Sequence, residues 1–239
     1  MRKSGCMRAN IARRRNDSKS AGRIGLAGVL ALAAVFGPAA AASWRAGAAD
    51  GRLGFRFVQA GVPEEGVFRA FDARFEFDPA HPEGGTACVE VATASVDSGD
   101  EERDTILRSA DFFDVARHPL AVYRGRLRRA GEALRLEGVL RLRGRDAPVA
   151  LDARLEPAAE GWRLVVRGTL DRLAFSVGEG DWADPQWIGR EVAVEARLRL
   201  RPDDGAAGLA RAGKGVENGC QAATEDGRDD GKAGPGPFR

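Results

Sequence analysis

Apolar and polar residues alternate with period two along most of the chain between Leu53 and Leu200. This alternation is typical of β-strands that bury one face and expose the other. Polar turns of hairpin length, containing Gly or Asp where unusual dihedral angles are needed, separate several of these segments. The pattern predicts eight strands, with expected ranges 53–58, 67–77, 88–94, 120–127, 134–142, 149–155, 162–175 and 192–200.

The number and order of the strands favour a closed sheet. Eight antiparallel strands joined by short turns most readily form a barrel, and a flat two-sheet sandwich is the alternative architecture. A barrel of this size either fills with its own side chains or holds one small ligand. Gly138 lies in the middle of an inward row, where a strand must bend or make room for something inside. The predicted fold is therefore an all-β, eight-stranded antiparallel barrel.

One segment, from Arg103 to Pro119, interrupts the alternation. Acidic residues crowd its beginning, where they favour the dipole of a helix, and Ile106 and Leu107 follow one turn before Ala110. The proline ends the segment, because the residue before a proline is pushed out of the α region. We expect one short helix here, near one end of the barrel, that acts as a lid.

Residues 1–42 have the three parts of an export signal: a basic stretch, the apolar run Ile24–Phe36 and a string of small residues. The apolar run is too short for a spanning helix, so a cleaved signal peptide is expected in preference to a retained membrane anchor. The triple arginine at residues 13–15 leaves twin-arginine export open beside the general route. Translation can begin at Met1 or Met7. We expect the mature protein in the periplasm, without stable membrane insertion.

Removing the expected signal changes the charge of the protein. The whole chain has 37 basic and 35 acidic residues, a net charge of +2. The signal contains eight of the basic residues and one of the acidic ones, so 29 basic and 34 acidic residues remain and the net charge falls to −5. No basic face with interleaved aromatic residues survives, and nucleic acid is not an expected partner.

The remaining chain divides into an ordered domain, residues 43–202, and a C-terminal segment, residues 203–239. The segment is rich in Gly, Ala, Asp and Arg and has too few large apolar residues to offset its ordering entropy, which predicts a disordered tail. Without the signal, two cysteines remain, Cys88 in a strand and Cys220 in the tail. An exported protein can pair them. We do not expect this disulfide, because Cys220 lies among very polar residues.

Four further segments accompany the expected lid in a fixed order: Ser95–Ser98, Pro119–Tyr123, Gly138–Val149 and Arg172–Gly178. Together they resemble the YceI-like family of exported, lipocalin-like proteins, over roughly 44–200. The resemblance implies an extended eight-stranded antiparallel barrel with a short helix at one end. It also implies a long apolar cavity, which in some members of the family holds a polyisoprenoid or an isoprenoid quinone.

The chain departs from the family's pattern at three positions. Many relatives have a histidine near the end of the first strand, where this chain has Gln59. Tyr123 and Gly125 stand where Phe and Ser are more common, so that Tyr123 adds a polar group to an otherwise apolar wall.

The candidate cavity wall consists of inward-facing strand residues and of aromatic residues from the lid and the last long loop. Its members are Phe55, Phe57, Phe71, Phe75, Phe112, Phe113, Tyr123, Leu136, Leu140, Phe175 and Trp182. We expect Phe112 and Phe113 to plug the barrel end rather than only to line an entrance. Arg103 and Asp104 are expected to hold the lid together as a cap and ion pair, the alternative being that they steer a lipid headgroup.

The sequence contains no constellation typical of catalysis. It has no Gly-x-Ser-x-Gly elbow and no cysteine with a plausible histidine partner, and Glu137 and Asp152, which would favour an enzyme if they faced inward, fall on outward positions. His81 and His118 have no carboxylate-rich spacing around them that would predict a metal site. We therefore expect neither catalytic nor metal-binding residues, and no cofactor other than a bound isoprenoid lipid or quinone.

The sequence and the resemblance together predict an exported binding protein that sequesters or carries an apolar isoprenoid-type lipid in its barrel. A homodimer is left open. Two alternatives remain at this point: an envelope stress or interaction module with a filled barrel, and a small-molecule enzyme on the same scaffold.

Overall fold

The computed structural model describes residues 41–203 and Cys220. Residues 1–40 of the expected signal peptide and nearly all of the expected tail lie outside the described residues, and Ala42, the last residue of the expected signal, is the first residue of β1. The strands are β1 (Ala42–Gly47), β2 (Gly51–Gln59), β3 (Val62–Phe68), β4 (Phe71–Asp78), β5 (His81–Ala92), β6 (Val96–Asp97), β7 (Leu120–Ala130), β8 (Ala133–Leu142), β9 (Arg145–Ala158), β10 (Gly161–Asp171) and β11 (Glu191–Pro202). The helices are α1 (Glu101–Arg108) and the short 3-10 helices η1 (Ala48–Asp50), η2 (Thr93–Ser95), η3 (Arg172–Phe175) and η4 (Gly180–Trp182).

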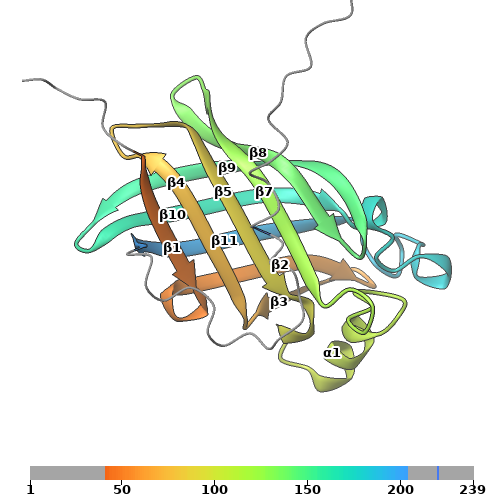
Figure 1. The fold of residues 1–239 in the computed structure, drawn as a ribbon. Helices are drawn as coiled ribbons and strands as arrows, with labels where there is room; N and C mark the ends of the chain where they lie inside the picture. Colours follow the sequence, from red (N-terminus) through yellow and green to blue (C-terminus); the bar gives the residue numbers. More distant parts are fainter. Residues whose placement is uncertain (1–40, 204–219, 221–239) are drawn as a thin grey trace, which may run out of the picture. The chain divides into compact units, whose positions relative to one another are not determined.

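Antiparallel pairing closes the sheet into a barrel (Figure 1). The ring runs β1-β4-β5-β7-β8-β9-β10-β11, and β1 pairs back onto β11 through Trp44 with Pro202 and Arg45 with Arg201. Three further strands extend the sheet outside the ring. β2 pairs with β11, β3 pairs with β2, and the short β6 pairs with β3, all antiparallel. The predicted eight-stranded antiparallel barrel with one α-helix is confirmed, and the flat sandwich is not formed.

The strands differ from the prediction in several places. β1, which closes the ring, and the short β6 lie outside the predicted ranges, and residues 172–175, predicted as the end of a strand, form η3. The expected strand 67–77 is divided, because the backbone amides of Arg69 and Ala70 leave the ladder and donate to the carbonyl and hydroxyl oxygens of Ser95. Residues 62–66, which lie outside the predicted strands, belong to β3. Their acidic residues and proline hide the alternation, and pairing with β2 holds them in a strand despite their composition.

The lid begins as predicted but is held together differently. The Asp100 side chain caps α1 by accepting from the Arg103 amide at 2.9 Å. Arg103 pairs with Glu64 on β3, at 2.8 Å, and not with Asp104. Asp104 is buried, accepts from the Ser98 amide at 2.8 Å and lies 3.5 Å from the guanidinium of Arg108. The expected pair is therefore wrong: residues adjacent on a helix point in different directions, and each charge finds a partner elsewhere.

The expectation about the cysteines is also wrong. Cys88 and Cys220 form a disulfide between residues 132 positions apart in the sequence. Cys88 lies on the outer face of β5, between the inward-facing Ala87 and Val89, and the amide of Cys220 donates to the Glu90 carboxylate at 2.7 Å. A covalent bond can fix a residue that its polar surroundings would not hold by packing.

The barrel is packed solid at the end opposite the lid. The rings of Trp44 and Phe77 stack with centroids 5.6 Å apart, and Trp162 meets Phe77 edge-on at 6.4 Å. Leu164 and Leu200 beside them are at most 1% exposed. This end supplies much of the core and leaves the rest of the barrel interior to the cavity.

Candidate ligand-binding cavity

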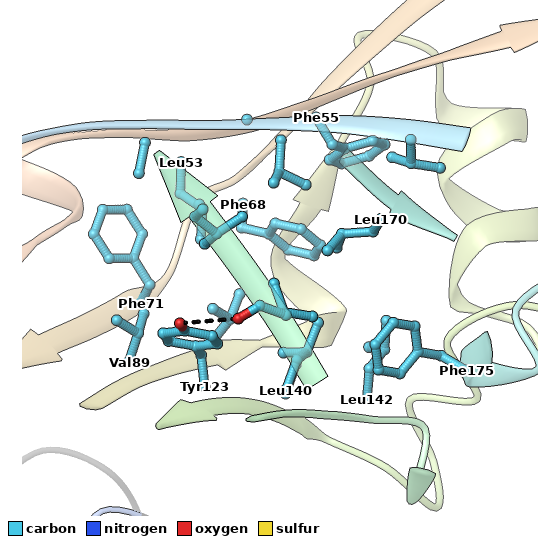
Figure 2. A pocket seen from close by; sticks show the side chains of 18 of the residues that line it. Leu53, Phe55, Phe68, Phe71, Val89, Tyr123, Leu140, Leu142, Leu170 and Phe175 are labelled. Atoms are coloured by element: carbon cyan, nitrogen blue, oxygen red, sulfur yellow. Dashed lines mark hydrogen bonds between the residues drawn. The ribbon is translucent and has the colours of Figure 1, made fainter. Parts of the chain in front are cut away.

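A cavity of about 220 Å³ lies inside the barrel, between the packed end and the lid (Figure 2). Strands β2 to β5 and β7 to β11 supply inward-facing residues to its wall, and the lid and the 172–188 segment supply the remainder. The wall is apolar because each strand turns alternate residues inward, and those positions are occupied by Phe, Leu, Val and Ala.

The structure brings ten of the eleven predicted wall residues together around this cavity. They are Phe55, Phe57, Phe71, Phe75, Phe112, Phe113, Tyr123, Leu136, Leu140 and Phe175. The eleventh, Trp182, does not line it; its ring packs against Phe112 with the centroids 5.6 Å apart. Contact of these residues with a ligand stays a prediction.

Several wall residues were not predicted, although the alternation contained the signal for most of them. Leu53, Val89, Leu142 and Leu170 occupy inward positions of predicted strands. In the continuous strand 67–77 that alternation predicts, Phe68 would face away from the inward-facing Phe71 and Phe75. The break at these two residues changes the face, so Phe68 points inward and packs 5.7 Å from Phe113.

Phe112 and Phe113 are both buried core residues and part of the cavity wall. They are 4% and 8% exposed, and they follow α1 in the turns that close the barrel end. Phe112 and Phe113 therefore plug the barrel end, as predicted, and also line the cavity.

Tyr123 brings a hydroxyl group into the wall, but this group is already bonded. The hydroxyl donates to the Leu136 carbonyl at 3.0 Å and lies 3.4 Å from that of Val149 (Figure 2). Gly125 makes room for it, since a Cβ there would lie 2.6 Å from the tyrosine oxygen. Burial, with a smaller contribution from the charge of Glu137, raises the pKa of Tyr123 well above its usual value. It therefore stays a neutral part of the wall.

Arg172 is the one charged side chain in the wall, and its donors are also occupied. It is 5% exposed, and its burial lowers the pKa of the guanidinium. Its N–H groups donate to five backbone carbonyls at 3.0 Å or less, those of Val177, Gly178, Trp182, Ile188 and Gly189. The side chain thereby holds the 177–189 segment across the end of the barrel. An arginine in a strand-to-loop position is normally interpreted as exposed, and only the three-dimensional path of the loop reveals its role.

The chemistry of this site is that of an apolar container. The Tyr123 hydroxyl and the Arg172 guanidinium direct their hydrogen bonds to the backbone, and Glu137 and Asp152 are exposed on the outer face, as alternation predicted. Within residues 41–203 and Cys220, no cluster of His, Cys, Asp and Glu could hold a metal ion, and no helix is long and apolar enough to span a bilayer. Such a wall can exclude water from a hydrocarbon chain and fix its position by shape.

Comparison with known proteins agrees with this architecture. Protein YceI of Escherichia coli O157:H7 is 33% identical over 140 residues, which cover 58% of this chain and 61% of that protein. Among solved structures, Burkholderia cenocepacia BcnA superposes with a TM-score of 0.60 at 27% identity, over 63% of this chain and 96% of BcnA. A polyisoprenoid binding domain from Saccharophagus degradans shares the fold, with a TM-score of 0.52 at 17% identity, over 68% of this chain and 99% of that domain.

The alignment to the E. coli protein spans about 61% of that protein's length. The family model for the YceI-like domain matches residues 44–200, from the first ring strand to the last. The chain therefore belongs to the YceI-like family.

Proposed function

We propose that this protein is exported to the periplasm and there sequesters or carries an apolar isoprenoid-type lipid, a polyisoprenoid or a quinone, in its barrel. The cavity carries this proposal: it is enclosed by apolar side chains, and its polar groups are bonded to the protein backbone. The relation to a fold that includes a polyisoprenoid binding domain supports the same ligand class. A barrel filled by its own side chains would leave no such space.

Hydrophobic transfer alone supplies enough energy for tight binding. Each buried methylene group contributes about 0.8 kcal/mol, so a five-carbon isoprene unit contributes roughly 3 to 4 kcal/mol. Association costs about 4 to 15 kcal/mol in lost freedom. A few buried units therefore exceed the cost without any polar contact, and the depth of the cavity limits how many units can be buried.

The disulfide between Cys88 and Cys220 supports export, since structural disulfides form in oxidising compartments such as the periplasm. N-terminal sequencing of the protein from a periplasmic fraction tests this part of the proposal. Export with cleavage predicts a mature chain that begins close to Ser43. Recovery of an intact N-terminus in the cytoplasmic fraction would contradict it.

Native mass spectrometry of periplasmic protein tests ligand binding. A mass increment that disappears on organic extraction, with an isoprenoid in the extract, is expected. Leu170→Trp, which fills the cavity from β10, should lose the increment, whereas Thr169→Trp, whose side chain is exposed on the outer face of the same strand, should keep it. Repeated absence of lipid, together with no quenching of tryptophan emission by added isoprenoid quinone, would refute the proposal.

A further inference from the structure

The exposed apolar side chains of the barrel are unevenly distributed. The described part of the chain has five large ones: Val58, Val62, Ile106, Val139 and Trp187. Four of them, all except Val139, belong to the lid end, where the β2–β3 turn, α1 and the 183–189 loop meet (Figure 1). Trp187 is the most exposed, at 61%. We call Val58, Val62, Ile106 and Trp187 the rim.

Hydrogen bonds and an ion pair bring the three rim segments together. The Ala60 amide, at the tip of the β2–β3 turn, donates to the Trp187 carbonyl at 2.8 Å, and the Gly189 amide donates to the Val58 carbonyl at 2.8 Å. On the other side, Arg103 joins α1 to Glu64 of β3 at 2.8 Å, and Ile106 lies one helical turn further along α1. These contacts bring the three segments to the same end of the barrel, with Val58 and Val62 on opposite faces of the β2–β3 hairpin.

Members of the rim are chain neighbours of cavity residues. Trp187 precedes Ile188, and Ile106 precedes Leu107; both following residues line the cavity. Val58 follows Phe57, which also lines it. At these three points an exposed apolar residue is adjacent in the chain to a residue that lines the cavity. A hydrocarbon chain that leaves the cavity here passes from one apolar surface to another.

The charges around the rim restrict the charge of the surface that the rim can bind. Glu101, Glu102, Glu179, Asp181 and Asp184 are exposed and form no ion pair within the described residues. Of the arginines at this end, Arg103 pairs with Glu64 and Arg190 with Asp171 at 2.7 Å. Arg143, which donates to the Ala110 carbonyl, and the exposed Arg145 form no ion pair within the described residues, but the five free acids outnumber them. This end therefore has excess negative charge, which an anionic surface repels and a zwitterionic one does not.

We propose that the rim docks on an electrically neutral lipid surface, where Trp187 and its apolar neighbours insert at the headgroup level and the ligand passes between membrane and cavity. Tryptophan suits this position because its ring is apolar and its N–H can remain hydrated. The rim side chains come from β2, β3, α1 and the 183–189 loop, and a fluid lipid surface can accommodate them without a complementary pocket. The proposal rests on the proposed function, since a lipid cargo gives the docking its purpose.

Co-sedimentation with phosphatidylcholine vesicles tests the docking. The full-length protein should bind, and the double variant Val62→Ser, Trp187→Ser should bind about tenfold more weakly, because two side chains worth about 1.5–3 kcal/mol each when fully buried insert only in part. Val139→Ser removes an equally apolar valine, 46% exposed on the outer wall of β8, and should bind within about twofold of the wild type. Equal losses in the two variants, or no vesicle binding by the wild type, would overturn the proposal; the second result would favour a protein partner.

Two additional arms separate this proposal from the proposed function. Adding phosphatidylglycerol to the vesicles should weaken binding at low salt, and salt should restore it; stronger binding to the anionic vesicles would overturn the choice of a neutral surface. Isoprenoid quinone added from ethanol, without vesicles, should load the wild type and the rim variant equally. If neither protein takes up the quinone, the proposed function is refuted. The vesicle co-sedimentation would still show whether the rim binds a lipid surface.

Discussion

At one end of the barrel, Trp44, Phe77 and Trp162 pack ring against ring, whereas towards the lid apolar side chains of similar size face an empty space of about 220 Å³. Both regions arise from the same alternation of residues on the same strands. At the packed end, facing rows supply large residues that interdigitate. Around the cavity, small residues such as Ala121 and Ala196 interrupt the rows and leave the space unfilled.

The two ends are also closed by different forces. Aromatic and leucine side chains alone close the packed end. At the lid end, Phe112 and Phe113 are supplemented by hydrogen bonds from Arg172 to backbone carbonyls and from the Ser98 amide to the buried carboxylate of Asp104. Hydrogen-bonded loops can open locally at a lower free-energy cost than a dense core. This difference predicts that the packed end contributes more to stability than the lid end, and in the proposed function the lid end is where a ligand enters.

Matched leucine truncations should give the largest contrast. Leu164→Ala removes a side chain that is 1% exposed in the packed end and should lower the free energy of unfolding by about 2–5 kcal/mol. Leu140→Ala, in the cavity wall, should cost at most about half as much, because the lost atoms already have open space on one side. Urea denaturation of the ligand-free proteins measures both. Equal losses would show that the cavity is not empty in the absence of ligand.

Removal of the disulfide should have the next largest effect. Cys220→Ser opens a crosslink that constrains a long loop in the unfolded chain, and should lower the free energy of unfolding by about 2–4 kcal/mol. Dithiothreitol should lower the stability of the wild type by a similar amount and leave Cys220→Ser unchanged. An effect of the reductant on the variant would mean that the loss does not come from this bond.

Replacing Arg172 should destabilise the lid end more than the packed end. Arg172→Met leaves the carbonyls of the 177–189 segment without their donor and should cost about 1–3 kcal/mol. Arg172→Lys keeps the charge but cannot span five acceptors, so it should behave similarly. Hydrogen exchange should show the change first in residues 177–189. Protection lost uniformly over the barrel would contradict a local role.

The smallest effect should be a pH dependence at the lid end. A hydrogen bond from Arg190 lowers the pKa of Asp171, whose carboxylate also caps η3 through the Leu173 amide. The pKa of Asp171 is therefore lower in the folded state than in the unfolded state, where it is about 3.9. The stabilisation that the Asp171 carboxylate provides is complete above about pH 3.9 and is lost as the pH falls through the folded-state pKa. The Tm difference between the wild type and Asp171→Asn should therefore shrink towards pH 2. A Tm difference that persists at pH 2 would show that Asp171 acts through its hydrogen bond to the Leu173 amide and not through its charge.

Alternation was sufficient to predict an antiparallel barrel and most of its inward-facing residues, because burial of one face of each strand dictates both. It missed β1, the strand that closes the ring on β11. It could not predict the break between β3 and β4, which depends on hydrogen bonds from Arg69 and Ala70 to Ser95, a residue distant in the sequence. Nor could it place Arg172, whose buried position depends on a loop that wraps around it. The two cysteines left after the expected signal did suggest a disulfide, and local polarity was the wrong reason to discount it.

The dependence of affinity on chain length tests the central claim most directly. Isoprenoid quinones with one headgroup and increasing numbers of isoprene units can be titrated against the ligand-free protein, with tryptophan emission as the signal. If the apolar cavity holds the chain, Kd should fall steeply with each added unit and then become constant once the cavity is full. A Kd that does not change with chain length would place recognition in the headgroup and contradict the account.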